Sequence, residues 1–243
     1  MAEFSTAIVV GASSGIGEEM VRQLAAAGVR VAAVARRMDL LEQLAATAPE
    51  KILPYAHDVR RFEDAPALLD RVVADLGHVD LLIYNAGVMP RVEESEYNFQ
   101  KDREMIEVNL LGAMAWMNPC AAYMEARRAG TILGISSVAG DRGRRGNPGY
   151  HTSKAALTTY LEALRNRLSR YGVTVVTVKP GPVRTPMTEG LKLPLMIDAP
   201  EAARGALTHA QKGSVNAYVP PVWGPIMAVI CAVPSVVFRR TNI

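Results

Sequence analysis

The sequence predicts an α/β protein, built on a doubly wound parallel sheet of six to seven strands with helices on both faces. Short apolar runs and helical patterns alternate about six times along the chain, and this order is typical of parallel strands joined by covering helices. Right-handed crossovers then place helices on both sides of the sheet. The chain has 243 residues, of which 49% are hydrophobic, so it can bury one large core. We therefore expect residues 1–243 to form a single domain.

The expected elements follow this alternation in order. Strands are predicted at 7–10, 30–35, 52–56, 81–84, 131–135 and 174–178, with 217–219 as a candidate seventh. Helices are predicted at 15–27, 39–48, 65–76, 98–128 and 150–171, the fourth with an interruption near Pro119. Residues 186–200 contain three prolines and mixed polarity, so we expect a mobile segment that covers the site as a lid.

The composition argues against several classes of protein. The formal net charge is +3, which is too small to indicate nucleic-acid binding. Cys120 and Cys231 are far apart and match no metal-ligand spacing, so we expect two reduced, buried packing residues and no metal. Residues 1–10 have neither the basic segment nor the long apolar core of an export signal. The expected location is therefore the cytoplasm.

The C-terminal region, 215–243, is apolar and is expected to pack on the domain or extend it. No charged residue lies between Val215 and Phe238, and Arg239 and Arg240 follow at once. This length almost spans a bilayer, but prolines interrupt it at positions 220, 221, 225 and 234, so we expect no membrane span. Two alternatives remain. We favour a subunit contact or a lid, and the other is peripheral attachment, with apolar side chains inserted and the arginines meeting anionic headgroups.

A glycine-rich loop follows the first predicted strand and opens the first predicted helix. Its spacing is G-x-x-x-G-x-G. Gly11 permits a tight turn, Gly15 lets a pyrophosphate approach the backbone, and Gly17 lets the helix pack closely on the strand. The helix N-terminus supplies free N–H groups and the positive end of a dipole. We therefore predict a dinucleotide site at the loop, formed by Gly11, Ser13, Ser14, Gly15, Ile16 and Gly17.

The end of the second predicted strand indicates which dinucleotide binds. An acidic residue at this position usually holds a ribose 2′-hydroxyl, whereas this strand ends in Arg36 and Arg37. A guanidinium group can fork onto a 2′-phosphate, and such charge-assisted hydrogen bonds are worth about 1.5–3 kcal/mol each. The sequence therefore predicts a preference for NADP(H) over NAD(H).

A tyrosine, a lysine and a serine form the predicted proton-transfer machinery. Tyr150 and Lys154 are four residues apart on a predicted helix, so they share one face. An ammonium group near a phenol lowers its pKa from about 10, and such a pair suits the interchange of carbonyl and alcohol. Ser136 and Ser137 follow the fifth predicted strand, at the edge where ligands bind, and a hydroxyl there can hydrogen-bond a substrate oxygen.

Taken in order, these blocks resemble the main branch of the short-chain dehydrogenase/reductase family, whose chains have about this length. The matching blocks are residues 11–17, Asp58-Val59, Asn85-Ala86-Gly87, Asn109, the set of Ser137, Tyr150 and Lys154, and residues 180–185. The resemblance implies a Rossmann fold and an NADP(H)-dependent oxidoreductase (EC 1.1.1.-) acting on a small carbonyl or secondary-alcohol substrate. It also implies a homodimer or homotetramer.

The resemblance also implies a role for each matching residue. Tyr150 would be the general acid in reduction and the general base in oxidation, Ser137 would polarise the substrate carbonyl, and Asn109 would hold a water of the proton relay. Ser136, one residue off the family's spacing, is interpreted as structural. Lys154 would also hold the nicotinamide ribose. The remaining cofactor contacts would come from Asp58 and Val59 at the adenine, from Asn85, Ala86 and Gly87 beside the fourth strand, and from Pro180, Gly181, Val183 and Thr185 at the carboxamide.

The loop between Ser137 and Tyr150 and the apolar tail are less closely similar to a bacterial subgroup that reduces polyprenyl-phosphate-linked 2-keto sugars. The loop contains Arg142, Arg144 and Arg145, which we expect to be solvated, with contact to a phosphate-bearing substrate as the alternative. Other functions stay open. They are an NADP(H)-sensing or scaffold protein with weak catalysis, a lipid-linked keto-sugar reductase at the membrane surface, and a sugar epimerase.

Overall fold

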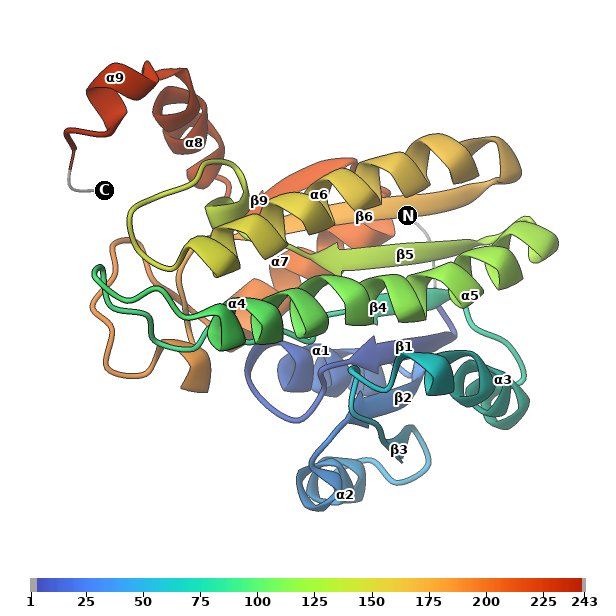
Figure 1. The fold of residues 1–243 in the computed structure, drawn as a ribbon. Coiled ribbons are helices and arrows are strands. Elements are labelled where there is room, and N and C mark those ends of the chain that lie inside the picture. The colour runs from blue at the N-terminus through green and yellow to red at the C-terminus, as the bar shows by residue number, and fades with distance from the viewer. Residues whose placement is uncertain (1–3, 242–243) are drawn as a thin grey trace.

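The computed structural model describes residues 4–241 and is centred on a seven-stranded parallel sheet (Figure 1). The strand order across the sheet is β3-β2-β1-β4-β5-β6-β9. The predicted doubly wound sheet is therefore confirmed, including its seventh strand. Residues 1–3 and 242–243, which belong to the predicted domain and its tail, lie outside the described residues. The strands are β1 (Thr6–Val10), β2 (Arg30–Ala35), β3 (Ile52–Ala56), β4 (Leu81–Tyr84), β5 (Gly130–Ile135), β6 (Val173–Pro180) and β9 (Asn216–Val219).

Helices cover both faces of the sheet because neighbouring side chains of each strand point to opposite sides. In β1, Ala7 and Val9 belong to one buried cluster, and Ile8 and Val10 belong to the other. The first cluster contains side chains of α1 (Gly15–Ala26), α2 (Met38–Ala46) and α7 (Ala199–Lys212), and the second those of α3 (Ala65–Leu76), α5 (Gly112–Arg127) and α6 (Pro148–Leu168).

All seven strands end at one edge of the sheet, on the left in Figure 1. β1 lies between β2 and β4, so the loop that follows β1 and the loop that follows β4 lead away in opposite directions. Ligands of doubly wound folds bind in the crevice that such a reversal opens at the carboxyl edge. The loops after β1, β2, β3 and β4 therefore converge on one place.

The long helical region before β5 differs from the prediction. Pro119 lies inside the uninterrupted helix α5, so the predicted break near this residue is wrong. The interruption comes earlier, as a π-helical turn at Glu107–Leu111 between α4 (Phe99–Ile106) and α5. π-helical turns are rare and occur mostly at functional sites, and this one carries Asn109.

The helix of the predicted catalytic pair begins two residues earlier than expected. α6 starts at Pro148, which occupies the first helical turn without needing an N–H donor, and Asn147 caps it. Asn147 is in the left-handed region with φ 50°. Its side chain accepts a hydrogen bond from the Tyr150 N–H and donates to the Pro90 carbonyl at 2.9 Å. The cap therefore fixes the first turn, which contains Tyr150.

Two segments after β6 bear on the predictions, the expected lid and the C-terminal tail. The predicted lid at 186–200 begins with a short turn at Pro186–Thr188, and its two ends are joined by β7 (Val183–Arg184) and β8 (Ile197–Asp198), which pair in parallel. The C-terminal tail folds into α8 (Trp223–Ala232) and α9 (Ser235–Phe238). No helix within residues 4–241 is long and apolar enough to cross a membrane. Of the two cysteines, Cys120 is buried as predicted, but Cys231 is exposed because it lies on the outer side of α8.

Candidate cofactor and active site

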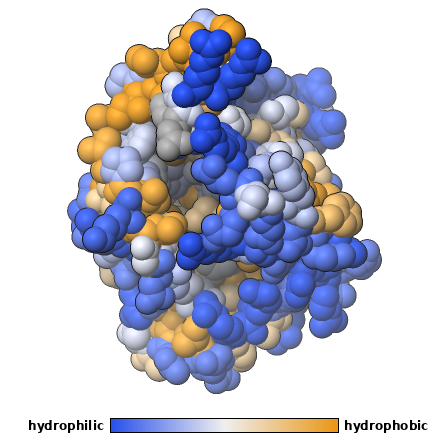
Figure 2. All heavy atoms as spheres, turned by 60° about the vertical axis from the view of Figure 1, so that its left-hand side comes forward, coloured by the Kyte–Doolittle hydropathy of each residue, from blue (hydrophilic) through white to orange (hydrophobic). Residues whose placement is uncertain are grey.

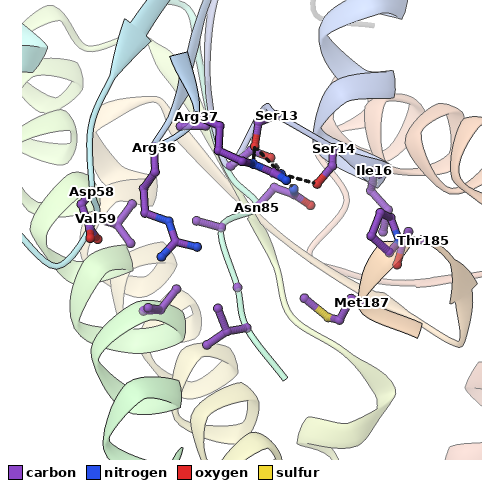
Figure 3. A pocket seen from close by; sticks show the side chains of 18 of the residues that line it. Ser13, Ser14, Ile16, Arg36, Arg37, Asp58, Val59, Asn85, Thr185 and Met187 are labelled. Carbon is purple, nitrogen blue, oxygen red and sulfur yellow. Dashed lines mark hydrogen bonds between the residues drawn. The ribbon is translucent and has the colours of Figure 1, made fainter. Parts of the chain in front are cut away.

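A pocket opens at the carboxyl ends of β1, β2, β3 and β4 (Figure 3). It brings together most of the residues that were predicted to bind the dinucleotide. Ala35, His57, Val88, Val108, Pro186 and Met187 were not predicted but also line it. The predicted residues in its lining are Gly11, Ser13, Ser14, Gly15, Ile16, Arg36, Arg37, Asp58, Val59, Asn85, Ala86, Gly87 and Thr185.

Close backbone packing shapes the glycine loop at the floor of the pocket. Gly11 has φ +89°, and a Cβ there would lie 2.5 Å from the Ala86 nitrogen. A Cβ on Gly17 would lie 2.0 Å from the Gly11 carbonyl oxygen. The Asn85 side chain donates to that same carbonyl at 3.0 Å. Larger residues are excluded at both positions, so Gly17 supports the loop from behind and does not line the pocket.

The N-terminus of α1 faces the pocket with free donors. Ser14 precedes the helix in an extended conformation, and its side chain makes no capping hydrogen bond. The first N–H groups of the helix therefore remain available, together with the positive end of the helix dipole. Such an arrangement binds phosphate groups.

The two predicted arginines lie at the end of the pocket near β2 and differ in their contacts. Arg37 donates to the Ser13 hydroxyl at 2.8 Å and to the Ser14 hydroxyl at 3.0 Å (Figure 3). Arg36 extends into the pocket and makes no side-chain hydrogen bond or ion pair with any other residue of the described chain. Two guanidinium groups and two hydroxyls at one place could hold a phosphate group.

Asp58 supplies the only carboxylate among the residues that line the pocket, and it forms a salt bridge with the neighbouring Arg60. Arg60 approaches Asp58 to 2.6 Å. The hydrogen bond from Arg60 lowers the pKa of Asp58 to about 2, and the charge of Arg36 contributes in the same direction. The carboxylate is therefore neutralised locally, and the end of the pocket stays positive overall.

Ser137 and Tyr150 meet at the carboxyl end of β5. Ser137 is the second residue after the strand and accepts a hydrogen bond from the Ala139 N–H at 3.1 Å. Burial raises the pKa of Tyr150, and a hydrogen bond with the Ser137 side chain opposes this rise. The two hydroxyl groups thus lie close enough together for both to contact one substrate oxygen.

Lys154 lies one helical turn beyond Tyr150 and is only 4% exposed. Its ammonium group donates to the Ile135 carbonyl at 2.9 Å and lies 5.8 Å from the centre of the Tyr150 ring. Burial lowers the pKa of Lys154 to about 8. The predicted lowering of the Tyr150 pKa by Lys154 is not observed, because the ammonium points to the end of β5 and only Ser137 opposes the effect of burial.

Asn109 is fully buried beside these residues. Its oxygen accepts from the Val88 N–H at 2.7 Å, and its nitrogen donates to the Val88 carbonyl at 3.0 Å and to the Ser153 hydroxyl at 2.9 Å. Ser153 in turn donates to the Tyr150 carbonyl. Asn109 therefore joins the strand end after β4 to the first turns of α6, and most of its hydrogen-bonding capacity is used within the protein.

Gly87 connects the pocket with the catalytic candidates. It lines the pocket, and a Cβ there would lie 3.4 Å from the Asn109 side-chain oxygen and 3.6 Å from the Lys154 nitrogen. Ser136, by contrast, points away and bonds to the Lys154 carbonyl and the Thr158 hydroxyl. This geometry agrees with the interpretation of Ser136 as structural.

Six predicted cofactor residues do not line this pocket: Gly17, Tyr150, Lys154, Pro180, Gly181 and Val183. Gly181 instead lies against the indole of Trp223, and a Cβ on it would be 1.9 Å from the indole nitrogen. Trp223 is 5% exposed, and its N–H has no hydrogen-bond partner among residues 4–241. The tail therefore packs directly behind the end of β6, a contact that the sequence analysis missed.

Arg142 and Arg144 are partly buried against the tail, which corrects the prediction that they are solvated, whereas Arg145 is exposed as predicted. Arg142 donates to three carbonyls at the end of α8, those of Ile230 (2.6 Å), Cys231 (3.1 Å) and Val233 (2.6 Å). The buried Nε of Arg144 has no partner in the described part of the chain, and desolvation lowers its pKa. The reason is tertiary packing, because α8 covers the loop.

A buried ion pair anchors the same loop to two strands. Asp141 and Lys179 are 2.5 Å apart, with side chains 8% and 10% exposed, and the Tyr218 hydroxyl donates to Asp141 at 2.9 Å. Burial, together with this hydrogen bond, raises the pKa of Tyr218 to about 12. Across residues 4–241, no group of three His, Cys, Asp or Glu side chains could share a metal ion.

The sequence is similar to known proteins of one family. The family model described as short chain dehydrogenase matches residues 5–194. An uncharacterized oxidoreductase of Myxococcus xanthus is 37% identical over 203 residues, which cover 80% of this chain and 79% of that protein.

Solved structures extend the similarity to the whole chain. A short-chain dehydrogenase from Streptomyces avermitilis is 26% identical, with a TM-score of 0.82 over 95% of this chain and 94% of that one. A short-chain dehydrogenase from Burkholderia cenocepacia, solved in complex with NADP, shares the fold with a TM-score of 0.86 over 99% and 98%, at 24% identity. The chain belongs to the short-chain dehydrogenase family, whose members among these relatives are oxidoreductases.

Proposed function

We propose that the protein is an NADP(H)-dependent oxidoreductase that interconverts a carbonyl and a secondary alcohol, with Tyr150 as the general acid and base. The observation that carries this proposal is the closeness of the Tyr150 and Ser137 side chains at the carboxyl end of β5, with Lys154 one helical turn beyond Tyr150. Gly87 lies between the pocket and Lys154, and because it has no side chain the Lys154 ammonium group lies close to the pocket. A substrate oxygen at Tyr150 would thus lie close to a cofactor in that pocket.

The residues of the pocket fit NADP(H). The free N–H groups at the start of α1 would hold the pyrophosphate, and Arg37 with Ser13 and Ser14 would hold the 2′-phosphate. Arg36 adds a second, unpaired cation at this end. When bound, NADP(H) would donate or accept the hydride. Further contacts would come from Asp58, Val59, Asn85, Ala86, Gly87, Lys154 and Thr185.

The chain's own residues would manage the proton. Tyr150 would give its phenolic proton to the carbonyl oxygen during reduction and take it back during oxidation. The Ser137 hydroxyl would donate to the same oxygen and stabilise the negative charge that develops there. Lys154, which is mostly protonated at pH 7 given its pKa of about 8, would favour the phenolate once its ammonium turns toward the ring. Asn109 would hold a water of the relay.

The test is turnover of a panel of carbonyls with NADPH and of alcohols with NADP⁺. Tyr150→Phe should reduce kcat by at least about 10²- to 10⁴-fold, the usual contribution of a general acid. Tyr160→Phe is the matched control, because Tyr160 lies on the same helix and its hydroxyl bonds to Asn118 instead. Undiminished turnover in Tyr150→Phe would refute the assignment. NADPH binding without turnover of any compound would favour the cofactor-sensing alternative.

A lipid-linked keto-sugar reductase is the second candidate within the enzyme class. It is favoured by the exposed apolar tail beside the arginine loop. Higher kcat/KM for lipid-linked than for water-soluble keto sugars would support it. We also propose a homodimer or homotetramer, for which the exposed Tyr97 and Phe99 before and at the start of α4 offer apolar contact area. Light scattering of the purified protein would measure this state.

A further inference from the structure

The end of the described chain, residues 222–241, forms a surface unit of two short helices that we call the tail unit. Trp223 and Met227 attach it to the protein by packing against Val138. Much of the remaining surface of α8 and α9 is apolar and exposed, with Val229 at 68% and Val236 at 52%. An apolar surface of this kind on a soluble fold marks an interaction site.

Arginines surround the tail unit on the side of the loop after Ser137. They line a cavity together with Phe238 and Thr241, and Arg240 is exposed beside it. Among the described residues, neither Arg239 nor Arg240 forms a side-chain hydrogen bond or ion pair. Within residues 4–241, positive charge therefore exceeds negative charge at this place. The arginines of the cavity are Arg142, Arg144, Arg145 and Arg239.

The nearby carboxylates do not neutralise this cluster. Glu94 reaches Arg145 at 3.9 Å. Asp141 is already paired with the buried Lys179 and accepts a hydrogen bond from Tyr218. The described residues thus place fewer carboxylates than arginines at the cavity, and an external anion could bind there.

The tail unit and the arginine loop are built as one rigid piece. The guanidinium of Arg142 closes the C-terminal end of α8 by its three carbonyl contacts and stacks on the Phe238 ring at 3.9 Å. Arg144 reaches the Met227 sulfur at 3.5 Å. These contacts hold the apolar helices next to the arginines, so one surface can contact both the charged headgroups and the apolar interior of a bilayer.

This unit lies on the face where the candidate site opens. Figure 1 places α8 and α9 beyond the carboxyl ends of the strands, and Figure 2, which views that side, shows apolar atoms over the upper part beside strongly hydrophilic ones. The segment after β7 adds exposed apolar side chains on the same side, with Leu191 at 45%, Leu193 at 41% and Leu195 at 50%.

We propose that the tail unit docks the protein on an anionic lipid bilayer, with the face that carries the candidate site turned toward the membrane. The exposed valines of α8 and α9 insert at the boundary of headgroups and acyl chains. Arg239 and Arg240 bind lipid phosphates, which the planar guanidinium group contacts through two hydrogen bonds. The anionic leaflet attracts each of these cations.

A second copy of the chain is the less suitable occupant of this surface. In a two-fold symmetric contact the same patch meets itself. The arginine cluster of one copy would then lie close to that of the other, and like charges across an interface oppose association. An anionic bilayer instead complements both the apolar surface and the charge.

Vesicle co-sedimentation of the full-length protein tests the proposal. The protein should bind vesicles of phosphatidylcholine with phosphatidylglycerol more strongly than phosphatidylcholine alone, and high salt should weaken this binding. Arg239→Ala/Arg240→Ala should lower partitioning about 30-fold, since each basic residue contributes roughly fivefold. Val236→Glu/Val237→Glu should abolish binding. Arg167→Ala/Arg204→Ala, which removes the same charge from exposed positions on α6 and α7, should bind like the unaltered protein.

Several outcomes would overturn the proposal. One is equal binding to both vesicle types, and another is an arginine variant that binds as the control pair does. If light scattering shows a dimer that Val236→Glu/Val237→Glu dissociates, and no vesicle binds, a second copy covers the surface. If inorganic phosphate competes fully and the valine variant still binds, the cavity is a free-phosphate site. Tyr150→Phe should bind vesicles normally, so loss of carbonyl turnover and loss of docking are separate results.

Discussion

Replacing Lys154 with methionine should make the protein more stable at pH 7 while it removes the proposed proton chemistry. The Lys154 ammonium is held in a site that is only 4% exposed. Burial lowers its pKa from 10.5 to about 8. Each pKa unit corresponds to 1.36 kcal/mol, so keeping this group charged at pH 7 costs about 3 kcal/mol of folding stability.

The expected net gain is smaller, because the substitution also removes a hydrogen bond. The Ile135 carbonyl loses the donor that Lys154 provides at 2.9 Å, and an unpaired buried acceptor costs about 1–3 kcal/mol. Methionine has a similar length and fills the same space with a flexible apolar chain. We therefore expect Lys154→Met to be about 1–2 kcal/mol more stable at pH 7, as measured by urea unfolding.

The pH dependence of this difference identifies its cause. The unfolded chain keeps the lysine proton up to about pH 10.5, whereas the folded chain loses it near pH 8. The cost is thus fully present below pH 8, declines between pH 8 and 10.5, and is absent above. The advantage of Lys154→Met should shrink as pH rises through this window. Lys192→Met, at an exposed position, is the control and should show no such trend. A variant that is less stable at pH 7, or a constant difference at pH 7 and pH 9.5, would refute the reasoning.

Three further predictions concern the pocket and its support. Arg37→Ala should raise KM for NADPH about 10- to 100-fold and leave KM for NADH unchanged, because it removes charge-assisted hydrogen bonds to one phosphate only; parallel changes for both cofactors would contradict this. Gly17→Ala should weaken cofactor binding and lower Tm, since its Cβ would lie 2.0 Å from the Gly11 carbonyl oxygen. Asp141→Asn should lower the free energy of unfolding by about 3–5 kcal/mol, because it leaves the charge of Lys179 buried and unpaired, and a loss under 1 kcal/mol in denaturant titration would contradict this.

The sheet was predictable because its strands are short apolar runs whose identity is local. β1 is buried along its whole length, as a central parallel strand must be, and its β-branched sequence is visible directly. The seventh strand was predicted from three residues and is confirmed by its pairing with β6. The helix break was placed wrongly at Pro119, because proline is the strongest helix-break signal in this stretch, whereas a π-helical turn has no characteristic sequence pattern.

The glycine loop and the arginines at the end of β2 were also found from local order alone. What the sequence could not give was the direction in which a side chain points. The four-residue spacing puts Tyr150 and Lys154 on one face, but the direction of the ammonium depends on the free carbonyl of Ile135, nineteen residues away in the chain. Arg142 is a stronger case, since its partners at the end of α8 are about ninety residues away. The sequence alone does not show whether the arginines of such a loop are solvated or packed, because that depends on a distant segment that covers the loop.

The same long-range contacts join the tail unit to the candidate active site. Asp141 lies between Ser137 and Tyr150 in the chain, its partner Lys179 immediately precedes Pro180, and Tyr218 belongs to β9. One buried network therefore ties the carboxyl ends of β6 and β9 to the loop that precedes the helix of the proposed acid, Tyr150. Arg142, which is bound to the end of α8, and Trp223, which packs on Gly181, attach the tail unit to this same part of the fold, so the tail unit has little freedom to move relative to the loop beside Tyr150.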